Sequence, residues 1–371
     1  RNESMRLIHC ADLHLDSGMR THLTKEKARE RKKELLLTFQ RMVEYAAENE
    51  VEAILIAGDL FDTRNISATA CHAVWDAVCS HSEITFFYLK GNHDTERFLA
   101  ERETLPDNFK TFGTEWTSWP LGERIVVSGL ELTEENAGNA YHSLVLRPEM
   151  FHIVMLHGQE TKTGAKDRAQ VIRLRDLKHK GIDYLALGHI HSYKEGQIDA
   201  RGVWCYPGCL EGRGFDECGE HGFVLLDVDE SAGTCTHRFE PFASRRLWEV
   251  PTDISGCETP AEMLGRIREA LGGSVSPADL VKIVLTGEMD VESRIDLDYL
   301  QKSLEPDFYF VKVSDETTLR VDADRFSLDE TLKGEFVRTV MAAEDLSKEE
   351  RAAVIRFGLR AIAGEEVLGC D

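Results

Sequence analysis

Residues 54–62 read Ile54-Leu55-Ile56-Ala57-Gly58-Asp59-Leu60-Phe61-Asp62. An apolar run of strand length ends here at a glycine and a carboxylate. This pattern is typical of a buried parallel strand whose carboxyl end presents Asp59 at the rim of a sheet. In open α/β sheets ligands bind at this rim. Because a Gly-Asp pair is also common in ordinary turns, the interpretation depends on how the other strands end.

The chain around this stretch alternates between strand and helix patterns. Strands are predicted at residues 5–10 and 84–89, and helices at residues 25–48 and 67–79. This βαβαβ order implies right-handed crossovers and a mainly parallel sheet. Later patterns predict strands at residues 124–130, 151–156 and 183–187, a helix at 168–178, and an antiparallel meander that completes the sheet at 193–198, 203–206, 221–227 and 234–239.

The composition shifts near residues 242–251, where we predict a domain boundary. A small α/β cap is predicted after it, with helices at 260–271 and 295–304 and strands at 280–285 and 308–313. Two further helices are predicted at 328–343 and 347–363. We therefore predict three domains, which cover residues 1–243, 244–326 and 327–371.

The 371-residue chain has a formal net charge of −22, from 44 basic and 66 acidic side chains. Residues 1–245 carry 29 basic and 39 acidic side chains, and residues 246–371 carry 15 and 27, so neither part is a basic tail. The balance argues against a broad basic surface for nucleic acid. It is compatible with a local site at which divalent cations are the main positive charges.

Cysteine usage and hydropathy indicate the compartment. The nine cysteines form no CxxC pair, and their odd number in a long chain predicts free thiols in a reducing environment. A zinc site built from Cys205, Cys209 and Cys218 is disfavoured, because no second pair of ligands at zinc-binding spacing accompanies these three cysteines. No apolar run approaches the ~20 residues of a membrane span, and the N-terminus lacks a signal-peptide core. We expect a cytoplasmic protein.

Oxygen and nitrogen ligands follow five predicted strands. Each one alone has an ordinary explanation as a turn, cap or surface residue, but all five groups stand at carboxyl ends of strands. Carboxylate, amide and imidazole ligands without thiolate suit manganese, iron or zinc. The candidates exceed the needs of one ion and suit two ions that share a carboxylate, for which Asp59 is the natural bridge. They are Asp12, His14, Asp59, Asn92, His93, His157, His189 and His191.

Five motifs together resemble the calcineurin-like metallophosphoesterase superfamily. They are DLH (12–14), GDLFD (58–62), GNHD (91–94), HG (157–158) and GHIH (188–191). The segment PGCLEGR (207–213) is similar to the one that follows GHIH in SbcD- and YhaO-type bacterial DNA repair exonucleases. The resemblance implies an α/β fold, a four-layer αββα sandwich, with a smaller α/β cap domain and C-terminal helices. It also implies a metal-dependent phosphoesterase, and in the nuclease branch a DNA exonuclease.

Carried onto this chain, the resemblance implies two metal ions, most often Mn²⁺ in such nucleases, with iron or zinc as alternatives. The first ion would be held by Asp12, His14, Asp59 and His191, and the second by Asp59, Asn92, His157 and His189. A hydroxide that bridges the ions would attack phosphorus.

The resemblance implies that His93 is a catalytic residue outside the ligand set, which stabilises the transition state or protonates the leaving oxygen. Asp94 would orient its imidazole. Asp62 stands where archaeal and eukaryotic relatives carry a histidine, and we interpret it as a turn or cap residue. Arg213 and Arg64 are candidate phosphate contacts.

Three functions compete at this point. The leading hypothesis is a two-metal DNA nuclease, and the cap and the 207–213 segment favour it. The acidic composition favours a phosphodiesterase or phosphatase for small nucleotides or phosphoproteins. The third is a non-catalytic, metal-binding scaffold of an ATPase complex. Apolar stripes on the last two helices fit docking onto the chain's own body or binding to an SbcC/Rad-type ATPase subunit, and a homodimer is a further open partner.

Overall fold

The computed structural model describes residues 4–19, 23–62, 66–161 and 171–364. It divides into two compact units, Arg1–Arg246 and Leu247–Asp371, and each is described by itself. The three-domain division with boundaries after residues 243 and 326 stays a prediction.

The first unit contains a sheet of six strands in the order β14-β13-β1-β2-β3-β4. β1 to β4 run parallel to one another. β13 pairs antiparallel with β1, and β14 pairs antiparallel with β13 at the edge of the sheet. The stretch that opened the sequence analysis forms β2, a central strand whose last five residues are all buried. The bounds are β1 Ser4–Cys10, β2 Val51–Ala57, β3 Thr85–Leu89, β4 Phe109–Thr111, β13 Gly222–Asp229 and β14 Thr234–Pro241.

A second sheet of six strands has the order β11-β12-β10-β7-β6-β5. Its central strands β6, β7, β10 and β12 are parallel, and the edge strands β5 and β11 are antiparallel. The bounds are β5 Thr117–Leu121, β6 Ile125–Gly129, β7 Phe151–His157, β10 Tyr184–Gly188, β11 Lys194–Gln197 and β12 Val203–Tyr206.

The predicted meander after residue 193 is wrong in two respects. β11 turns back onto β12, so that β12 returns parallel to β10 instead of antiparallel to it. β13 and β14 leave this sheet and extend the first one through β1. The reason is burial, because residues 222–226 of β13 are all buried and therefore need a position covered on both faces.

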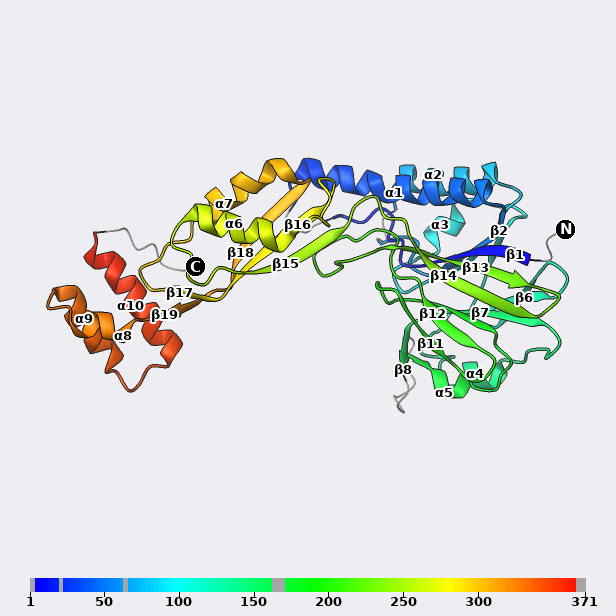
Figure 1. The fold of residues 1–371 in the computed structure, drawn as a ribbon. Coiled ribbons are helices and arrows are strands. Elements are labelled where there is room, and N and C mark those ends of the chain that lie inside the picture. Colours follow the sequence, from blue (N-terminus) through cyan, green and yellow to red (C-terminus); the bar gives the residue numbers. More distant parts are fainter. Residues whose placement is uncertain (1–3, 20–22, 63–65, 162–170, 365–371) are drawn as a thin grey trace. The chain divides into compact units, whose positions relative to one another are not determined.

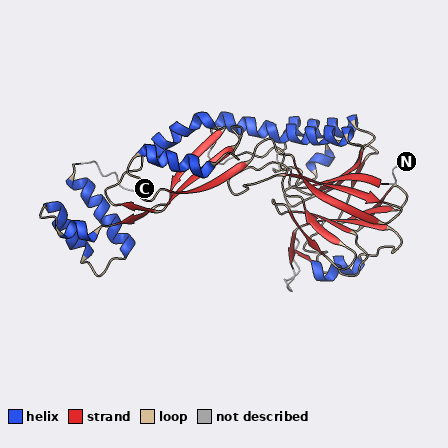
Figure 2. Ribbon diagram, in the orientation of Figure 1, coloured by secondary structure: helices blue, strands red, loops and turns tan. Residues whose placement is uncertain are grey.

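Helices cover both outer faces of the paired sheets (Figure 1). α1 Lys25–Glu48, α2 Ala68–Ser80 and α3 Arg97–Ala100 lie on the first sheet, and α4 Ala140–Ser143 and α5 Leu174–Leu177 lie on the second. Ile54 and Ile56 pack with Phe39 of α1, whereas Leu55 packs with Ile153 of the other sheet. Because successive side chains of a strand point to opposite faces of the sheet, β2 contributes side chains to two different cores. The fold is the expected four-layer αββα sandwich, and its strands form two stacked sheets in Figure 2.

The predicted helix at residues 168–178 is wrong in its described part. Residues 171–173 form the strand β9 Val171–Arg173, which pairs with β8 Gln159–Thr161, and only the four residues of α5 are helical. The backbone N–H groups that a longer helix would use are therefore engaged in β pairing.

The second unit contains a parallel sheet with the order β15-β16-β18. Its strands are β15 Leu247–Asp253, β16 Leu280–Thr286 and β18 Phe310–Asp315, and α6 Pro260–Leu271, α7 Leu297–Leu304 and the 3₁₀ turn η1 Glu305–Asp307 accompany them. Residues of α6 and α7 share a core with this sheet. β15 was not predicted, because Pro251 interrupts its pattern, but an edge strand tolerates proline.

A smaller helical group follows in the same unit. β17 Glu288–Asp290 pairs with β19 Thr318–Arg320, and α8 Ala323–Ser327, α9 Leu332–Met341 and α10 Lys348–Ile362 come next. Ser347 and Glu350 form a capping box that starts α10 at the predicted place. The predicted helix at 328–343 begins later, at Leu332. Within the described part of the chain, no helix is both long and apolar enough to cross a membrane.

Candidate metal centre

Five strand ends meet at one edge of the two stacked sheets. β1, β2 and β3 come from the first sheet and β7 and β10 from the second. The loops after β1 and β2 are joined by main-chain hydrogen bonds, from Asp12 N to Gly58 O at 3.0 Å and from His14 N to Asp59 O at 3.0 Å. These bonds hold the two carboxylate-bearing turns side by side.

Four candidate ligands have left-handed backbone conformations that side chains rarely adopt. Their φ angles are 50° for Asp12, 43° for His14, 53° for Asp59 and 107° for His189. Such conformations cost on the order of 1–3 kcal/mol each and persist where the surroundings hold them for a function. These four residues belong to the set whose side chains meet at the shared edge.

The first group of facing ligand atoms comes from Asp12, His14 and His191, and these atoms all lie within 4.8 Å of one another. The Nε2 atoms of His14 and His191 are 3.2 Å apart. Asp59 borders this group, with its Oδ2 atom 3.8 Å from Nε2 of His14. These four residues are the predicted ligands of the first ion.

The second group joins Asp59 to the other sheet. Nε2 of His157 lies 3.4 Å from Oδ2 of Asp59 and 2.9 Å from Oδ1 of Asn92. Nδ1 of His189 lies 3.2 Å from the same Asn92 oxygen. Asp12 also belongs here, because it forms a second cluster with Asp59 and His157. The structure thus brings all seven predicted ligands together and places Asp59 between the two groups.

The donor set fits bound cations. Nδ1 of His191 lies 2.7 Å from Glu217 Oε1, and Nδ1 of His14 lies 3.0 Å from Asp62 Oδ1. For His191, a ring N–H donated to the Glu217 carboxylate leaves Nε2 as a lone pair, which is the usual arrangement of metal-binding histidines. The Nε2 atoms of His14 and His191 meet at one position, 3.2 Å apart, where a bound cation would take both lone pairs.

Burial perturbs the acids and bases of the centre. It raises the pKa of Asp12 to about 7, since neighbouring imidazoles offset the loss of hydration only in part. It lowers the pKa of His14, which favours the neutral form that binds metal. Burial also acts on His157, but the Asp59 carboxylate outweighs it and raises the pKa of His157 to about 9. Divalent cations bound among these groups would compensate the buried carboxylates.

Two carboxylates that the sequence interpretation missed support the histidines. Glu217 contacts His191, and Asp62 contacts His14. The interpretation of Asp62 as a turn or cap residue is therefore wrong. The Asp62 carboxylate also accepts a hydrogen bond from Arg213 Nη1 at 3.0 Å, and Glu217 accepts one from Arg213 Nη2 at 2.9 Å. Arg213 thus links the two supporting carboxylates, and its side chain is only 19% exposed.

His93 and Asp94 occupy different positions from those expected of a catalytic pair. The Asp94 carboxylate accepts hydrogen bonds from the backbone N–H groups of Leu60, Phe61 and Gly91. It therefore fixes the Asp59 loop, and the predicted orientation of His93 by Asp94 is not what these contacts show. The His93 side chain is 45% exposed, and its Nδ1 lies 3.9 Å from Asp62 Oδ1. Its backbone N–H donates to Asp59 at 2.9 Å. Arg64, the other candidate phosphate contact, lies outside the described residues.

We expect Glu217→Gln to weaken metal binding by about 10–100-fold, because carboxylates that orient metal-binding histidines have effects of this size. The amide keeps the shape but removes the charge that faces both His191 and Arg213. Titration of the metal-depleted protein with Mn²⁺ in a calorimeter measures the change. Glu220→Gln, at an exposed carboxylate three residues away, is the matched control. Equal affinities for the two variants would contradict the orienting role.

We expect Gly91→Ala to displace Asp59. A Cβ atom at position 91 would lie 2.2 Å from Asp59 Oδ1 and 2.4 Å from Asp59 N. Overpacking of this kind costs about 1–3 kcal/mol, and here it also moves a candidate ligand. Thermal unfolding and metal content check both effects. Gly113→Ala is the control, because a Cβ there has no neighbour within 4 Å. A Gly91→Ala protein with normal metal content would show that Asp59 does not need this close contact.

Comparisons with known proteins agree with the geometry. The sequence profile described as "Calcineurin-like phosphoesterase" matches residues 5–193. The chain is 31% identical over 300 residues to "Uncharacterized metallophosphoesterase YhaO" of Bacillus subtilis, which covers 76% of this chain and 72% of that protein. It is 24% identical over 402 residues to "DNA double-strand break repair protein Mre11" of Saccharolobus solfataricus, with 98% and 97% covered. The Mre11 protein of Methanopyrus kandleri is 24% identical over 327 residues, with 77% and 69% covered.

A solved structure is also similar in part. The crystal structure of TT1561 of Thermus thermophilus has 13% identity and a TM-score of 0.42, and the match covers 63% of this chain and 98% of that one.

Proposed function

Because the chain belongs to the calcineurin-like phosphoesterase family, and is therefore a metal-dependent phosphoesterase, we propose that its substrate is DNA and that its metal is manganese. In this proposal the protein is a nuclease that hydrolyses phosphodiester bonds, in the manner of an exonuclease. The metal centre of the first unit is the site of the reaction.

The extent of the similarity to DNA repair proteins carries the proposal. The profile of the phosphoesterase family ends at residue 193, and the first unit ends at Arg246. The match to the Mre11 protein of Saccharolobus solfataricus covers 98% of this chain and 97% of that protein, so it includes the second unit. A simple phosphatase would need to share only the first part. Similarity that continues through both units supports a shared substrate class.

The residues have distinct roles in this proposal. Asp12, His14, Asp59 and His191 would hold one ion, and Asp59, Asn92, His157 and His189 the other. When bound, the ions would supply Lewis acidity toward a phosphate oxygen and lower the pKa of a water. Glu217 would hold the His191 imidazole in orientation, and the Asp62 carboxylate lies 3.0 Å from the His14 ring. His93, whose side chain is 45% exposed, would give a proton to the leaving oxygen or stabilise charge in the transition state.

The test incubates the purified protein with Mn²⁺ and labelled single- and double-stranded DNA, and in parallel with bis-p-nitrophenyl phosphate. We expect cleavage of both DNA and ester, which a chelator abolishes. Cleavage of the ester but of no DNA, even with an added ATPase subunit, would reject the nuclease and leave a small-nucleotide phosphodiesterase or phosphatase. The net charge of −22 favours that second candidate. No hydrolysis of either substrate would leave the scaffold function.

We further propose that the last helices bind an SbcC/Rad-type ATPase subunit. Large apolar side chains lie exposed there, with Leu328 86% and Leu332 70% exposed, and Phe357 of α10 is 37% exposed. Coiled-coil segments offer complementary apolar surface. Light scattering of the protein with and without the ATPase subunit tests this proposal. Self-association of the protein alone, lost in Leu328→Ser, would assign the surface to a homodimer instead.

A further inference from the structure

Helix α1 carries a charged side chain on its buried face. The buried residues of this helix include Arg31, Leu35, Thr38 and Phe39, at the spacing of the apolar stripe of an amphipathic helix. The Arg31 side chain is 1% exposed. Removing a guanidinium group from water is costly, and apolar side chains of similar volume often make a protein equally or more stable. An arginine at this position therefore indicates a role beyond packing.

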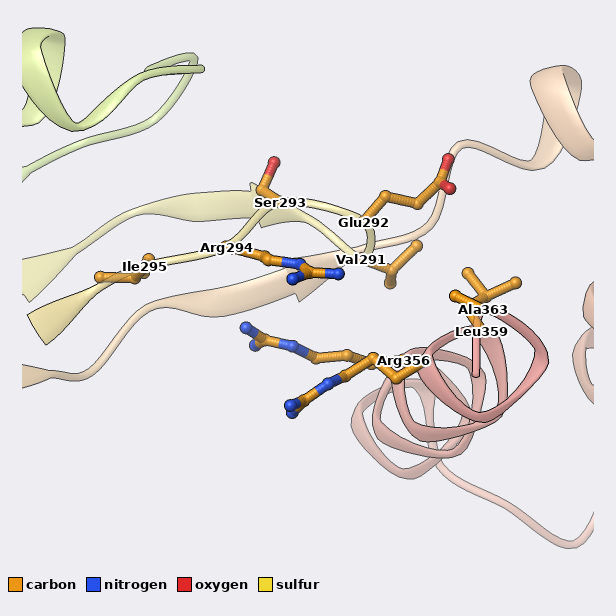
Figure 3. A pocket seen from close by; sticks show the side chains of 9 residues that line it. Val291, Glu292, Ser293, Arg294, Ile295, Arg356, Leu359 and Ala363 are labelled. Carbon is orange, nitrogen blue, oxygen red and sulfur yellow. The ribbon is translucent and has the colours of Figure 1, made fainter. Parts of the chain in front are cut away.

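Its burial distinguishes Arg31 from arginines that line surface pockets. In the second unit, Arg294 and Arg356 lie at a pocket of about 240 Å³ between the segment after β17 and α10 (Figure 3). Arg294 is exposed and Arg356 is half-buried, so both retain contact with water. The guanidinium group of Arg31 is closed off from water, and it must find its acceptors within the protein.

The acceptors of Arg31 are two carboxylates and one backbone carbonyl. Nη1 of Arg31 donates to Glu34, and Nη2 donates to the carbonyl oxygen of Gly212 at 2.7 Å. Both nitrogens also contact Glu211 Oε2, at 3.4 and 3.3 Å. The Glu211 side chain is fully buried, and its other oxygen accepts a hydrogen bond from Thr38 of α1 at 2.7 Å. Two side chains of α1 thus hold the loop that contains Glu211 and Gly212.

One peptide group passes this constraint on toward the metal centre. The Gly212 carbonyl oxygen accepts the hydrogen bond from Arg31. The N–H of the same peptide group belongs to Arg213, and it donates to Glu217 Oε2 at 2.8 Å. Because a peptide group is planar, its C=O and N–H bonds point in fixed, opposite directions. A carbonyl held by Arg31 therefore sets the direction from which the N–H approaches Glu217.

Glu217 is the carboxylate that contacts a predicted metal ligand. Its Oε1 atom lies 2.7 Å from Nδ1 of His191. The Arg213 side chain contacts the same carboxylate, with Nη2 at 2.9 Å from Glu217 Oε1, and it reaches Asp62 through Nη1 at 3.0 Å. Both the backbone and the side chain of Arg213 thus hold Glu217. A shift of this loop would therefore move the acceptor of the His191 ring N–H.

We propose that Arg31 and Glu211 are positioning residues of the metal centre. They hold the peptide group between Gly212 and Arg213 so that it fixes Glu217, which keeps the His191 imidazole turned toward the first ion. The proposal rests on the metal centre of the proposed function, and it does not depend on DNA as the substrate. It explains why a costly buried ion pair stands where an apolar contact would stabilise the fold as well.

The experiment measures Mn²⁺ binding by the metal-depleted full chain and its variants in a calorimeter. Arg31→Met/Glu211→Gln removes one positive and one negative charge and leaves Glu34 paired with Arg245 at 2.7 Å. Glutamine at position 211 keeps an oxygen for Thr38. Arg31→Lys is a milder second variant, which retains the charge but lacks the paired N–H groups of arginine. Thermal unfolding checks that both variants are folded.

Each variant is also made in a Glu217→Gln background. In the unaltered background we expect the double variant to weaken Mn²⁺ binding by about 10-fold, the lower end of the effect of residues that support metal ligands, and Arg31→Lys to weaken it less. In the Glu217→Gln background we expect little further loss, because the substituted residues act through that carboxylate. A pair that only stabilised the fold would cause the same loss in both backgrounds.

The matched control is Arg201→Met/Asp183→Asn, which removes an ion pair with contacts of 2.7 and 2.8 Å. Asp183 precedes β10, at the end of the strand opposite to His189 and His191. This control should bind Mn²⁺ and hydrolyse bis-p-nitrophenyl phosphate as the unaltered protein does.

The outcomes separate this proposal from the proposed function. Unaltered Mn²⁺ affinity in both Arg31 variants, or an equal loss in the two backgrounds, would overturn the positioning role while the metal centre stands. Failure of both variants to fold would assign the pair to stability and also overturn it. If the unaltered protein bound no Mn²⁺ and hydrolysed no ester, the metal centre and the positioning role would both be rejected. Ester hydrolysis without DNA cleavage would reject the DNA substrate alone, and the comparison of the two backgrounds would still decide the positioning role.

Discussion

Asp59→Asn should remove both metal ions together and lower phosphoesterase activity by at least about 10³-fold. This loss is larger than the ~10–100-fold loss of activity that follows when a residue that only supports the metal ligands is changed. The Asp59 carboxylate is 2% exposed and lies between the two groups, 3.8 Å from His14 and 3.4 Å from His157. Asparagine keeps the size but removes the negative charge from a site where burial makes each charge more influential. Metal content after dialysis, measured by mass spectrometry, reports the number of ions kept.

His191→Ala provides the comparison, because His191 lies in the first group only. That variant should retain about one ion per chain, whereas Asp59→Asn should retain close to none. If Asp59→Asn kept one ion at unaltered affinity, the shared-ligand assignment would be wrong. Both variants keep Glu217 and Asp62. A difference in the number of retained ions therefore comes from the substituted residue itself.

The ligands were predictable because they depend on a simple geometric rule. The carboxyl ends of parallel strands meet at one edge of a sheet, so polar residues that follow several strands must come close together. Asp59 and His157 each follow an unbroken apolar run and were identified in this way. The rule does not say how many sheets take part. The seven residues converge because two mixed sheets stack with the carboxyl ends of their parallel strands at the same edge.

The supporting residues were not predictable by the same rule. Glu217 follows no strand and reaches His191 through a loop, and its distance of 26 residues along the chain leaves no periodic signal. Asp62 lies three residues beyond Asp59 and looked like an ordinary turn residue. For Asp94 the sequence predicted a contact, with the His93 imidazole, that the structure does not show. It adjoins His93 in sequence, but neighbouring loop side chains point in different directions, and three backbone N–H groups hold the Asp94 carboxylate elsewhere.

In the proposed nuclease, His93→Ala should lower the rate of DNA cleavage by about 10²–10⁴-fold, the usual contribution of a positioned proton donor, with metal content unchanged. His93 forms a cluster with His14 and Asp62. It is outside both clusters that contain Asp12, and its side chain is 45% exposed at the edge of the centre. The contact that it makes with Asp59 comes from its backbone N–H, which alanine retains, so Asp59 should stay in position in the variant. Turnover and metal content are measured on the same preparation, and loss of an ion would show that His93 is a ligand.

The choice of substrate separates the two roles open to His93. A leaving deoxyribose oxygen is strongly basic and needs a proton as the bond breaks, whereas p-nitrophenolate is stable without one. If His93 donates that proton, His93→Ala should impair DNA cleavage far more than hydrolysis of bis-p-nitrophenyl phosphate. If His93 stabilises charge on the phosphate oxygens, both substrates should lose similar factors, since both develop that charge. Unaltered rates on both substrates would exclude His93 from the reaction and leave its backbone contact with Asp59 as its one role.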